Sequence, residues 1–461
     1  MSAGVGDFDV AIVGASIAGC TAARLFALRG ARVALIERQP APDAYKTVCT
    51  HFVQSSATPT IERIGLAPLL DARGAVHNSV DLWTRYGGWV VLTDSDVPYG
   101  YSITRRSLDP ILRKLAADTP GVELMTGQTA VGLLGDGRPA GVRIEDRART
   151  RREVTARLVV GADGRDSKVA RWARVPGRVK PHRRFFYFAY WSGLRPFTTR
   201  SKVWLLDPDA AYTFPMEDGL TLALVGPHRD RLPEFRADLE GAYGRMLNAL
   251  PDAPEFGAAR LESKLLGKLE LPNVYRPAAR PGVAFVGDAA MAADPMWGVG
   301  CGWAFQSAGW LAHQTADALS GGSDLDAALG RYRRLHRRRL LAHYLMISDI
   351  ASGRPTNPIE RRVYRAAARD RVVRRALEQV ASRRRSPARL LDPRVLVHMA
   401  RPGGGSPPAR AHVLRSADAG ARRAARAAGY RPATAPSAAA IATEPPTASS
   451  GTTTIQPCSS A

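Results

Sequence analysis

The sequence has few cysteines and no long apolar run, and each absence excludes a class of protein. Cys20, Cys49, Cys301 and Cys458 are scattered, with no C-x-x-C pair and no histidine nearby at ligand spacing. We therefore expect no disulfide framework, no zinc site and no other metal, and a reducing compartment fits. No run approaches the roughly 18 apolar residues that span a bilayer, and the first ten residues lack the regions of a signal peptide. A cytoplasmic protein without a transmembrane segment is expected.

Lysine is absent from the last part of the chain, although the net charge is +23. Residues 331–461 hold 26 arginines and no lysine against seven acidic residues, so only +4 of the net charge remains for residues 1–330. A basic nucleic-acid binder is the alternative that this charge suggests. No aromatic-interleaved basic strand or recognised nucleic-acid fold accompanies the arginines, which favours a solvated helical face and no nucleic-acid partner. Attraction of NADPH, an anionic carrier-bound substrate or a membrane surface is a weaker option.

The start of the chain predicts a strand, a glycine turn, a helix and a second strand. DVAIVG is typical of a strand buried on both faces, helix formers follow from Ser16 to Arg29, and ARVALIER gives the second strand. Parallel strands this close together need a helical crossover, so this is a βαβ unit. Two more buried strands end in glycine turns, at ARLVVGADG (156–164) and GVAFVGDAA (282–290).

An antiparallel sheet is predicted between these last two strands. Residues 184–226 alternate aromatic and polar residues, and an Asp-Gly pair at 218–219 signals a hairpin. The stretch GDGRPAG at 135–141 indicates another hairpin. One face of the sheet is expected to line an apolar pocket while the other packs on helices, with simple sheet core as the alternative.

The first glycine turn, GASIAG, departs from the dinucleotide pattern G-x-G-x-x-G because Ser16 takes the place of the middle glycine. Gly14 permits the tight turn, Gly19 permits close helix–strand packing, and the helix N-terminus offers free N–H groups to a pyrophosphate. Glu37 ends the second strand, where a carboxylate would accept ribose hydroxyls. The same residues also nearly match the nucleophile-elbow motif of hydrolases, G-x-S-x-G, with Ala18 in place of its last glycine. That fold places its nucleophile after several strands, so Ser16 comes too early for this role.

Three glycine motifs follow one another along the chain: GASIAG with Glu37, GADGRDSKVAR at 161–171, and GDAAMAADPMWGVGCG at 287–302. Together they resemble the three fingerprints of FAD-dependent monooxygenases of the p-hydroxybenzoate hydroxylase type, the group A flavoprotein hydroxylases, whose superfamily includes the geranylgeranyl reductases. The resemblance covers about residues 8–320, and the order and separations of the motifs also match. A joint match of this kind is far more specific than any one glycine motif.

The resemblance implies roles for the first motif and for the end of the second strand. Gly14, Ser16 and Gly19 would line the FAD pyrophosphate. Glu37 and Arg38 would lie at the adenosine ribose.

The resemblance implies further FAD contacts later in the chain. Arg105 looks like the family's arginine that faces the cofactor phosphates and the flavin, a task that suits its charge and planar set of donors. Asp163 matches the aspartate near the pyrophosphate, and Asp288 matches the aspartate that accepts the ribityl hydroxyls, with turn capping as the alternative for both. The loop beside the isoalloxazine would contain Pro295, Gly298, Gly300, Cys301 and Gly302.

The resemblance also implies an α/β fold: a Rossmann-like FAD-binding domain of the p-hydroxybenzoate hydroxylase type with an inserted antiparallel-sheet substrate domain and C-terminal helices. The oxidoreductase region is expected over residues 1–400 and a disordered tail over 401–461, where large apolar residues are few. The expected parts of the region 1–400 are a discontinuous FAD-binding domain (about 7–75, 100–180 and 275–325), a substrate-binding sheet (about 76–99 and 181–274) and an arginine-rich helical extension (326–400).

The activity implied by the resemblance is an NAD(P)H-consuming monooxygenase, a hydroxylase or epoxidase. It would act through a flavin C4a-hydroperoxide on an apolar aromatic or polyketide-like small molecule, with molecular oxygen as co-substrate. No second nucleotide-binding unit appears in the sequence, so NADPH or NADH would be a transient co-substrate.

Lys46 and Cys49 keep an alternative activity open. They resemble the K-x-C-G stretch of the geranylgeranyl-reductase and halogenase branches, although two residues rather than one separate Lys46 from Cys49 and Thr50 takes the place of the glycine. An FAD-dependent alkene (prenyl) reductase is therefore the alternative, and a halogenase is weaker because the W-x-W-x-I-P signature is missing. Lys46 and His51 are candidates for donating protons or holding a substrate oxygen, and a polar loop that packs on FAD is the competing interpretation.

Overall fold

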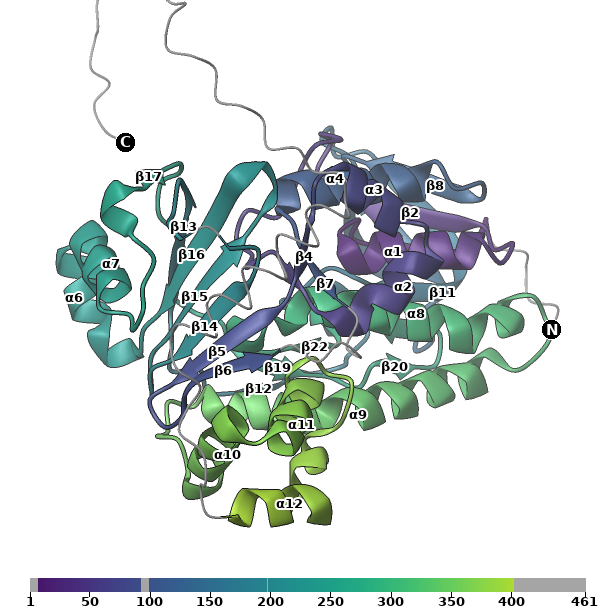
Figure 1. Ribbon diagram of the computed structural model, residues 1–461. Helices are drawn as coiled ribbons and strands as arrows, with labels where there is room; N and C mark the ends of the chain where they lie inside the picture. The colour runs from purple at the N-terminus through teal and green to yellow at the C-terminus, as the bar shows by residue number, and fades with distance from the viewer. Residues whose placement is uncertain (1–6, 93–98, 197, 402–461) are drawn as a thin grey trace, which may run out of the picture. The chain divides into compact units, whose positions relative to one another are not determined.

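A parallel sheet carries all three glycine motifs in the computed structural model, which describes residues 7–92, 99–196 and 198–401 (Figure 1). Its strand order is β20-β21-β11-β1-β2-β8, and all neighbours are parallel except β20 and β21. The three buried strands expected from the sequence are therefore adjacent and point the same way. The bounds are β1 Phe8–Val13, β2 Val33–Glu37, β8 Val122–Thr126, β11 Arg151–Gly161, β20 Ala279–Arg280 and β21 Val283–Phe285.

The turn between β1 and helix α1 (Ile17–Ala27) depends on two glycines. Gly14 has a φ of +104°, and a Cβ there would lie 2.6 Å from the carbonyl oxygen of Ala162 at the end of β11. A Cβ on Gly19 would lie 1.8 Å from the carbonyl oxygen of Gly14. Any side chain at either position would push the helix away from the sheet. The predicted βαβ unit is confirmed, with β2 parallel to β1.

A second, mostly antiparallel sheet has the order β17-β13-β16-β15-β14-β5-β6, and β18 also pairs with β13. The Asp-Gly hairpin is confirmed between β15 and β16. The hairpin at 135–141 joins β9 to β10, which belong to the first sheet because β10 pairs with β11. One pairing is parallel, between β5 and β14, which brings in a hairpin from much earlier in the chain. The bounds are β5 Val80–Thr84, β6 Gly88–Leu92, β9 Thr129–Leu134, β10 Gly141–Glu145, β13 Phe186–Ser192, β14 Ser201–Leu205, β15 Ala210–Pro215, β16 Leu220–Gly226, β17 Arg260–Leu261 and β18 Leu266–Lys268.

The two faces of this sheet bury different clusters, as the aromatic alternation predicts. Phe186 and Phe188 point to one face, where they join an apolar cluster with residues of the three C-terminal helices between residues 358 and 400. Phe185 and Trp204 point to the other face, against α6 (Leu232–Ala237) and α7 (Leu239–Asn248) (Figure 1).

The C-terminal part of the described chain is helical and rich in arginine. In α9, the buried side chains of Tyr332, His336 and Leu340 alternate with exposed arginines, so the basic stretch is a solvated helical face. Helix bounds are α8 Val299–Leu319, α9 Leu325–Ile350, α10 Pro358–Arg369, α11 Arg371–Ala381 and α12 Pro393–Ala400. The tail expected over 401–461 lies, from residue 402 on, outside the described residues. In the part of the chain that is described, no helix combines the length and the apolarity needed to cross a bilayer.

A buried carboxylate ties the third glycine motif to the antiparallel sheet. Asp294 is fully buried; its Oδ2 lies 2.8 Å from His182 Nε2 and 3.3 Å from Arg184 Nη1, both just before β13. Its Oδ1 accepts the backbone N–H of Met296 at 2.6 Å. Burial alone would raise the pKa of Asp294, but the hydrogen bond and charge of His182, the charge of Arg184 and this N–H outweigh it and lower the pKa.

Replacing Asp294 by Ala should lower the free energy of unfolding by about 3–5 kcal/mol, because Arg184 would remain buried without its counter-ion. The measurement is urea unfolding at pH 7. The control is Asp118→Ala, which removes an exposed ion pair with Lys114 and should lower the free energy of unfolding by no more than about 1 kcal/mol. Folding lowers the pKa of Asp294. The stability that Asp294 contributes is therefore complete above the ordinary Asp pKa of about 4, and it is lost as the pH falls below that value. Stability should therefore decline more steeply below about pH 4 in the wild type than in Asp294→Ala. Equal losses of unfolding free energy in the two variants at pH 7 would contradict the assignment.

Candidate active site

A cavity of 690 Å³ lies at the C-terminal edge of the parallel sheet, where open α/β sheets bind ligands. Residues that directly follow β1, β11 and β21 all contribute to its wall. Of the residues assigned from the sequence, only Gly19, His51 and Gly302 do not line it. Those that do are Gly14, Ser16, Glu37, Arg38, Lys46, Arg105, Asp163, Asp288, Pro295, Gly298, Gly300 and Cys301.

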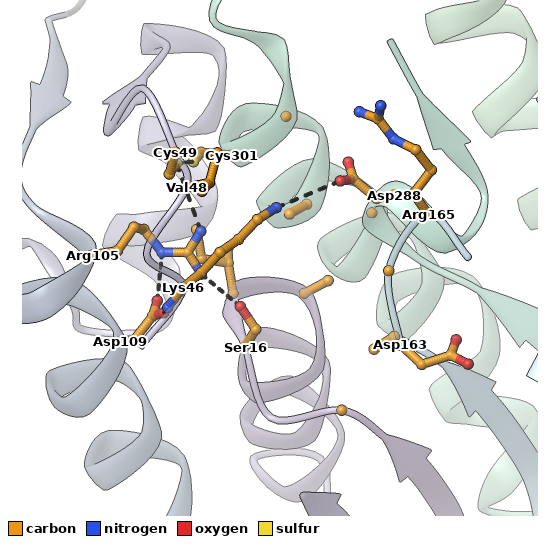
Figure 2. Close-up of a pocket in the computed structure, with 18 of the residues that line it drawn as sticks. Ser16, Lys46, Val48, Cys49, Arg105, Asp109, Asp163, Arg165, Asp288 and Cys301 are labelled. Atoms are coloured by element: carbon orange, nitrogen blue, oxygen red, sulfur yellow. Dashed lines mark hydrogen bonds and ion pairs between the residues drawn. The ribbon is translucent and has the colours of Figure 1, made fainter. Parts of the chain in front are cut away.

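Arg105 is the buried centre of this site, at the start of helix α4 (Arg105–Ala117) (Figure 2). Its Nε and Nη2 donate to the two carboxylate oxygens of Asp109 at 2.6 and 2.9 Å, and Nη2 also donates to Ser16 Oγ at 2.6 Å. Burial would lower the pKa of Arg105, but the negative charge of Asp109, the charge of Cys49 and the hydrogen bonds to Asp109 outweigh burial and raise it. Ser16 is therefore hydrogen-bonded to a permanent cation, an arrangement unlike that of a nucleophile beside its base. Asp109 was missed by the sequence analysis, although its i,i+4 spacing from Arg105 was the available signal.

His51 connects the backbone of Arg105 to the antiparallel sheet. Its Nδ1 accepts the N–H of Arg105 at 2.7 Å, and its Nε2 lies 2.6 Å from Tyr190 Oη. Burial lowers the pKa of His51, which favours the neutral ring. Because Nδ1 accepts a hydrogen bond, the proton of the neutral ring is on Nε2, which donates a hydrogen bond to Tyr190 Oη. Both ring nitrogens of His51 are thus engaged within the protein.

Lys46 is the more accessible of the two candidate proton donors. Its ammonium nitrogen lies 3.8 Å from Asp288 Oδ2, and Figure 2 shows the side chain reaching toward Asp288. About half of the Lys46 side chain is exposed. Lys46 and Asp288 thus place one charge of each sign on the cavity wall.

The other two carboxylates shape turns at the cavity edge. Asp163 Oδ1 accepts from Ser167 Oγ at 2.6 Å, and Oδ2 accepts the N–H of Val169 at 3.1 Å, at the start of α5 (Lys168–Trp172). This is the capping arrangement weighed for Asp163 in the sequence. Glu37 Oε2 accepts the N–H of Ala15 at 2.8 Å, inside the first glycine turn.

The residues present fit a dinucleotide cofactor. The buried Nη1 of Arg165, which also lines the cavity, has no hydrogen-bond partner, so it is a donor suited to an anionic oxygen. Helices α1 and α8 both begin at the cavity wall, which favours negative charge there. Sequence reasoning missed Arg165, although it directly follows the Asp-Gly pair of the second motif. Within the three described segments, no group of three or more His, Cys, Asp or Glu residues is placed to hold a metal ion.

Comparisons with known proteins agree with this geometry. Residues 7–230 match the family model described as FAD binding domain. A digeranylgeranylglycerophospholipid reductase of Thermoplasma volcanium is 23% identical over 350 residues, covering 73% of this chain and 85% of that protein.

Solved structures show the same fold. The flavin-dependent brominase Bmp2 superposes with a TM-score of 0.71 at 16% identity, covering 90% of this chain and 99% of that one. A probable FAD-dependent monooxygenase from Pseudomonas aeruginosa superposes with a TM-score of 0.62 at 20% identity, covering 75% of this chain and 98% of that one. The matched domain and these folds agree with the superfamily and the α/β fold indicated by the three motifs. Residues 7–230 are therefore an FAD-binding domain, and the chain is an FAD-dependent oxidoreductase that is similar in fold to a flavin-dependent brominase and a probable FAD-dependent monooxygenase.

Proposed function

We propose that the protein is an NAD(P)H-dependent FAD monooxygenase that hydroxylates or epoxidises an apolar aromatic or polyketide-like small molecule. The observation that carries this proposal is a second cavity of 260 Å³, which shares Phe52 and Gly298 with the larger one. Its walls are mainly apolar, with side chains from both the antiparallel sheet and the loop of the third motif. These apolar lining residues are Phe52, Val80, Leu82, Leu92, Val203, Phe214, Met296 and Trp297.

The second cavity has the chemistry of a substrate pocket. Aromatic and aliphatic walls with a few polar groups are typical of sites for small apolar ligands. Its polar lining includes Gln54, Asn78 and Glu378, so an occupant would be oriented by few hydrogen bonds. An apolar enclosure beside the flavin would also exclude water from the reacting centre. The dimensions and walls suit an aromatic or polyketide-like molecule better than a charged one.

In this proposal, the larger cavity holds FAD. The turn at Gly14, packed on Gly19, and the start of α1 would face the pyrophosphate, Glu37 and Arg38 the adenosine, and Asp288 the ribityl chain. When bound, FAD supplies two-electron transfer from NADPH or NADH and the activation of molecular oxygen. The loop Pro295 to Gly302 would lie along the flavin ring. The cations at the cavity would attract both anionic dinucleotides.

Within the protein, His51 would act as a positioning residue. Because its Nε2–H donates to Tyr190 Oη, the hydroxyl proton of Tyr190 is left to donate elsewhere. Lys46 would hold an anionic oxygen or donate a proton from the cavity wall, and cofactor binding would compete with its contact to Asp288.

A second candidate function is the reduction of an alkene. It is favoured by Lys46 and Cys49 on the cavity wall and by the relatives named as digeranylgeranylglycerophospholipid reductases. A reductase and a monooxygenase both take electrons from reduced FAD, but only the monooxygenase transfers an oxygen atom to the product. The fate of oxygen therefore separates the two.

Turnover under oxygen-18 should introduce one labelled atom per product molecule, detected as a mass increase of the product by mass spectrometry. The matched control is the same reaction under nitrogen, in which a monooxygenase should form no product. A saturated, unlabelled product formed without oxygen would establish the reductase instead.

Ser16→Ala should bind FAD with a dissociation constant within about tenfold of the wild type, because one hydrogen bond is lost, worth about 1.5 kcal/mol at most. Arg105 keeps its ion pair with Asp109 in this variant. Ser16→Leu should fail to bind FAD, because a branched side chain would enter the pyrophosphate end of the cavity. Titration of apoprotein with FAD, followed by flavin fluorescence, measures both. Normal binding by Ser16→Leu would remove the first motif from the cofactor site.

A further inference from the structure

Two cysteines far apart in the sequence meet in the wall of the larger cavity. Cys49 lies in the loop before strand β3 (Phe52–Val53), and Cys301 lies in the first turn of α8. Their sulfur atoms are 3.7 Å apart, and both residues line the cavity (Figure 2). The two residues are 252 positions apart in the sequence, so no local sequence pattern indicated this contact.

The surroundings of the pair make its two sulfurs unequal. Cys49 Sγ accepts the backbone N–H of His51 at 3.3 Å and lies 3.8 Å from Nη1 of Arg105. The hydrogen bond from Cys301 lowers the pKa of Cys49 despite burial, and the positive charges of Arg105 and Lys46 lower it further. The same hydrogen bond, together with burial, raises the pKa of Cys301. The surroundings therefore favour the thiolate at Cys49 and the thiol at Cys301.

A thiolate in contact with a thiol is the arrangement from which a disulfide forms. A disulfide needs a sulfur–sulfur distance of about 2.05 Å, so the two sulfurs, now 3.7 Å apart, would have to approach each other by about 1.65 Å. Cys20 offers the contrast within the same chain: it is fully buried in α1, and burial raises the pKa of its thiol. Disulfides in a reducing compartment are mostly transient and catalytic or redox-sensing.

We propose that Cys49 and Cys301 are a reversible dithiol–disulfide pair that exchanges two electrons with the FAD bound in the same cavity. The exchange of electrons with FAD, unlike the disulfide itself, rests on the FAD site of the proposed function. The pair would add a second two-electron centre to the protein, beside the flavin.

The exchange balances with the groups already named. Forming the sulfur–sulfur bond breaks the S–H bond of Cys301 and removes two electrons from the pair. Oxidised FAD takes up both electrons and the proton, so the total charge of the thiolate, thiol and flavin is unchanged. In the reverse direction, flavin reduced by NADPH or NADH returns the two electrons and the proton, and the disulfide opens.

The first experiment tests the disulfide without reference to the flavin. Full-length apoprotein and FAD-loaded protein are equilibrated in buffers of reduced and oxidised glutathione, alkylated with iodoacetamide and digested for mass spectrometry. We expect oxidising buffers to link the peptides of Cys49 and Cys301, with a loss of two hydrogen atoms, while Cys20 remains alkylated after denaturation. Reversal by the reduced buffer is expected. Two alkylated thiols at every glutathione ratio would overturn the proposal.

The second experiment tests the exchange with FAD. Wild-type protein carrying oxidised FAD and the disulfide should take up four electrons per flavin in an anaerobic dithionite titration, while Cys49→Ser and Cys301→Ser should take up two. Cys20→Ala is the matched control and should take up four. At partial reduction, a thiolate-to-flavin absorption band at long wavelength is expected in the wild type and in Cys301→Ser, but not in Cys49→Ser.

The outcomes distinguish the two proposals. A wild-type uptake of two electrons, with the disulfide demonstrated in glutathione buffers, would overturn the exchange with FAD. Failure of the protein to bind FAD would overturn the proposed function together with the exchange of electrons with FAD. The glutathione experiment on apoprotein would still decide the disulfide.

Discussion

The buried guanidinium of Arg105 is the constraint on which the arrangement of the site depends. A cation that is removed from water must be paired and hydrogen-bonded, or it destabilises the fold by several kcal/mol. Asp109 supplies the counter-ion from one turn further along α4, and Ser16 and Cys49 supply further acceptors from two other segments. The backbone N–H of Arg105 adds the contact to His51. One side chain thus sets the relative positions of the first glycine turn, the cysteine loop and helix α4.

The antiparallel sheet is tied to the same helix by a second buried carboxylate. Glu217, in the β15–β16 hairpin, accepts the N–H and the hydroxyl of Thr104 at 2.9 and 2.5 Å and the hydroxyl of Ser107 at 2.8 Å. These groups lie at the N-terminus of α4, where backbone donors lack intrahelical partners. Asp294 makes the corresponding connection to the loop of the third motif. The walls of the apolar cavity come from the antiparallel sheet and from the loop of the third motif. The hydrogen bonds of Glu217 and Asp294 hold these parts together, in addition to apolar packing.

The parts of this structure that were predictable are those encoded over a few consecutive residues. Apolar runs that end in glycine predicted three strands, which are neighbouring and parallel in the structure. The alternation of aromatic residues predicted a sheet whose two faces are covered by different residues, as the two apolar clusters show. Contacts between distant segments could not be predicted, because they leave no local pattern in the sequence. Examples are the pairing of β5 with β14, the contact of Cys49 with Cys301, and the hydrogen bonds of the buried carboxylates Asp294 and Glu217. The polar residues at these contacts look like ordinary loop residues in the sequence. Burial alone makes Asp294 important, and burial is a property of the assembled chain.

Helix α11 forms part of the wall of the apolar cavity, so substitutions in this helix can change the shape of that cavity. Glu378, Ala381 and Ser382 form part of the apolar cavity's wall, and the Gln54 side-chain amide donates to the carbonyl oxygens of both Ala381 and Trp297. This wall lies late in the chain, after all three glycine motifs have been completed. Substitutions in this helix can therefore reshape the apolar cavity while the three glycine motifs keep their sequence. Gln54 links the two regions, because its amide contacts α11 at Ala381 and the third motif at Trp297.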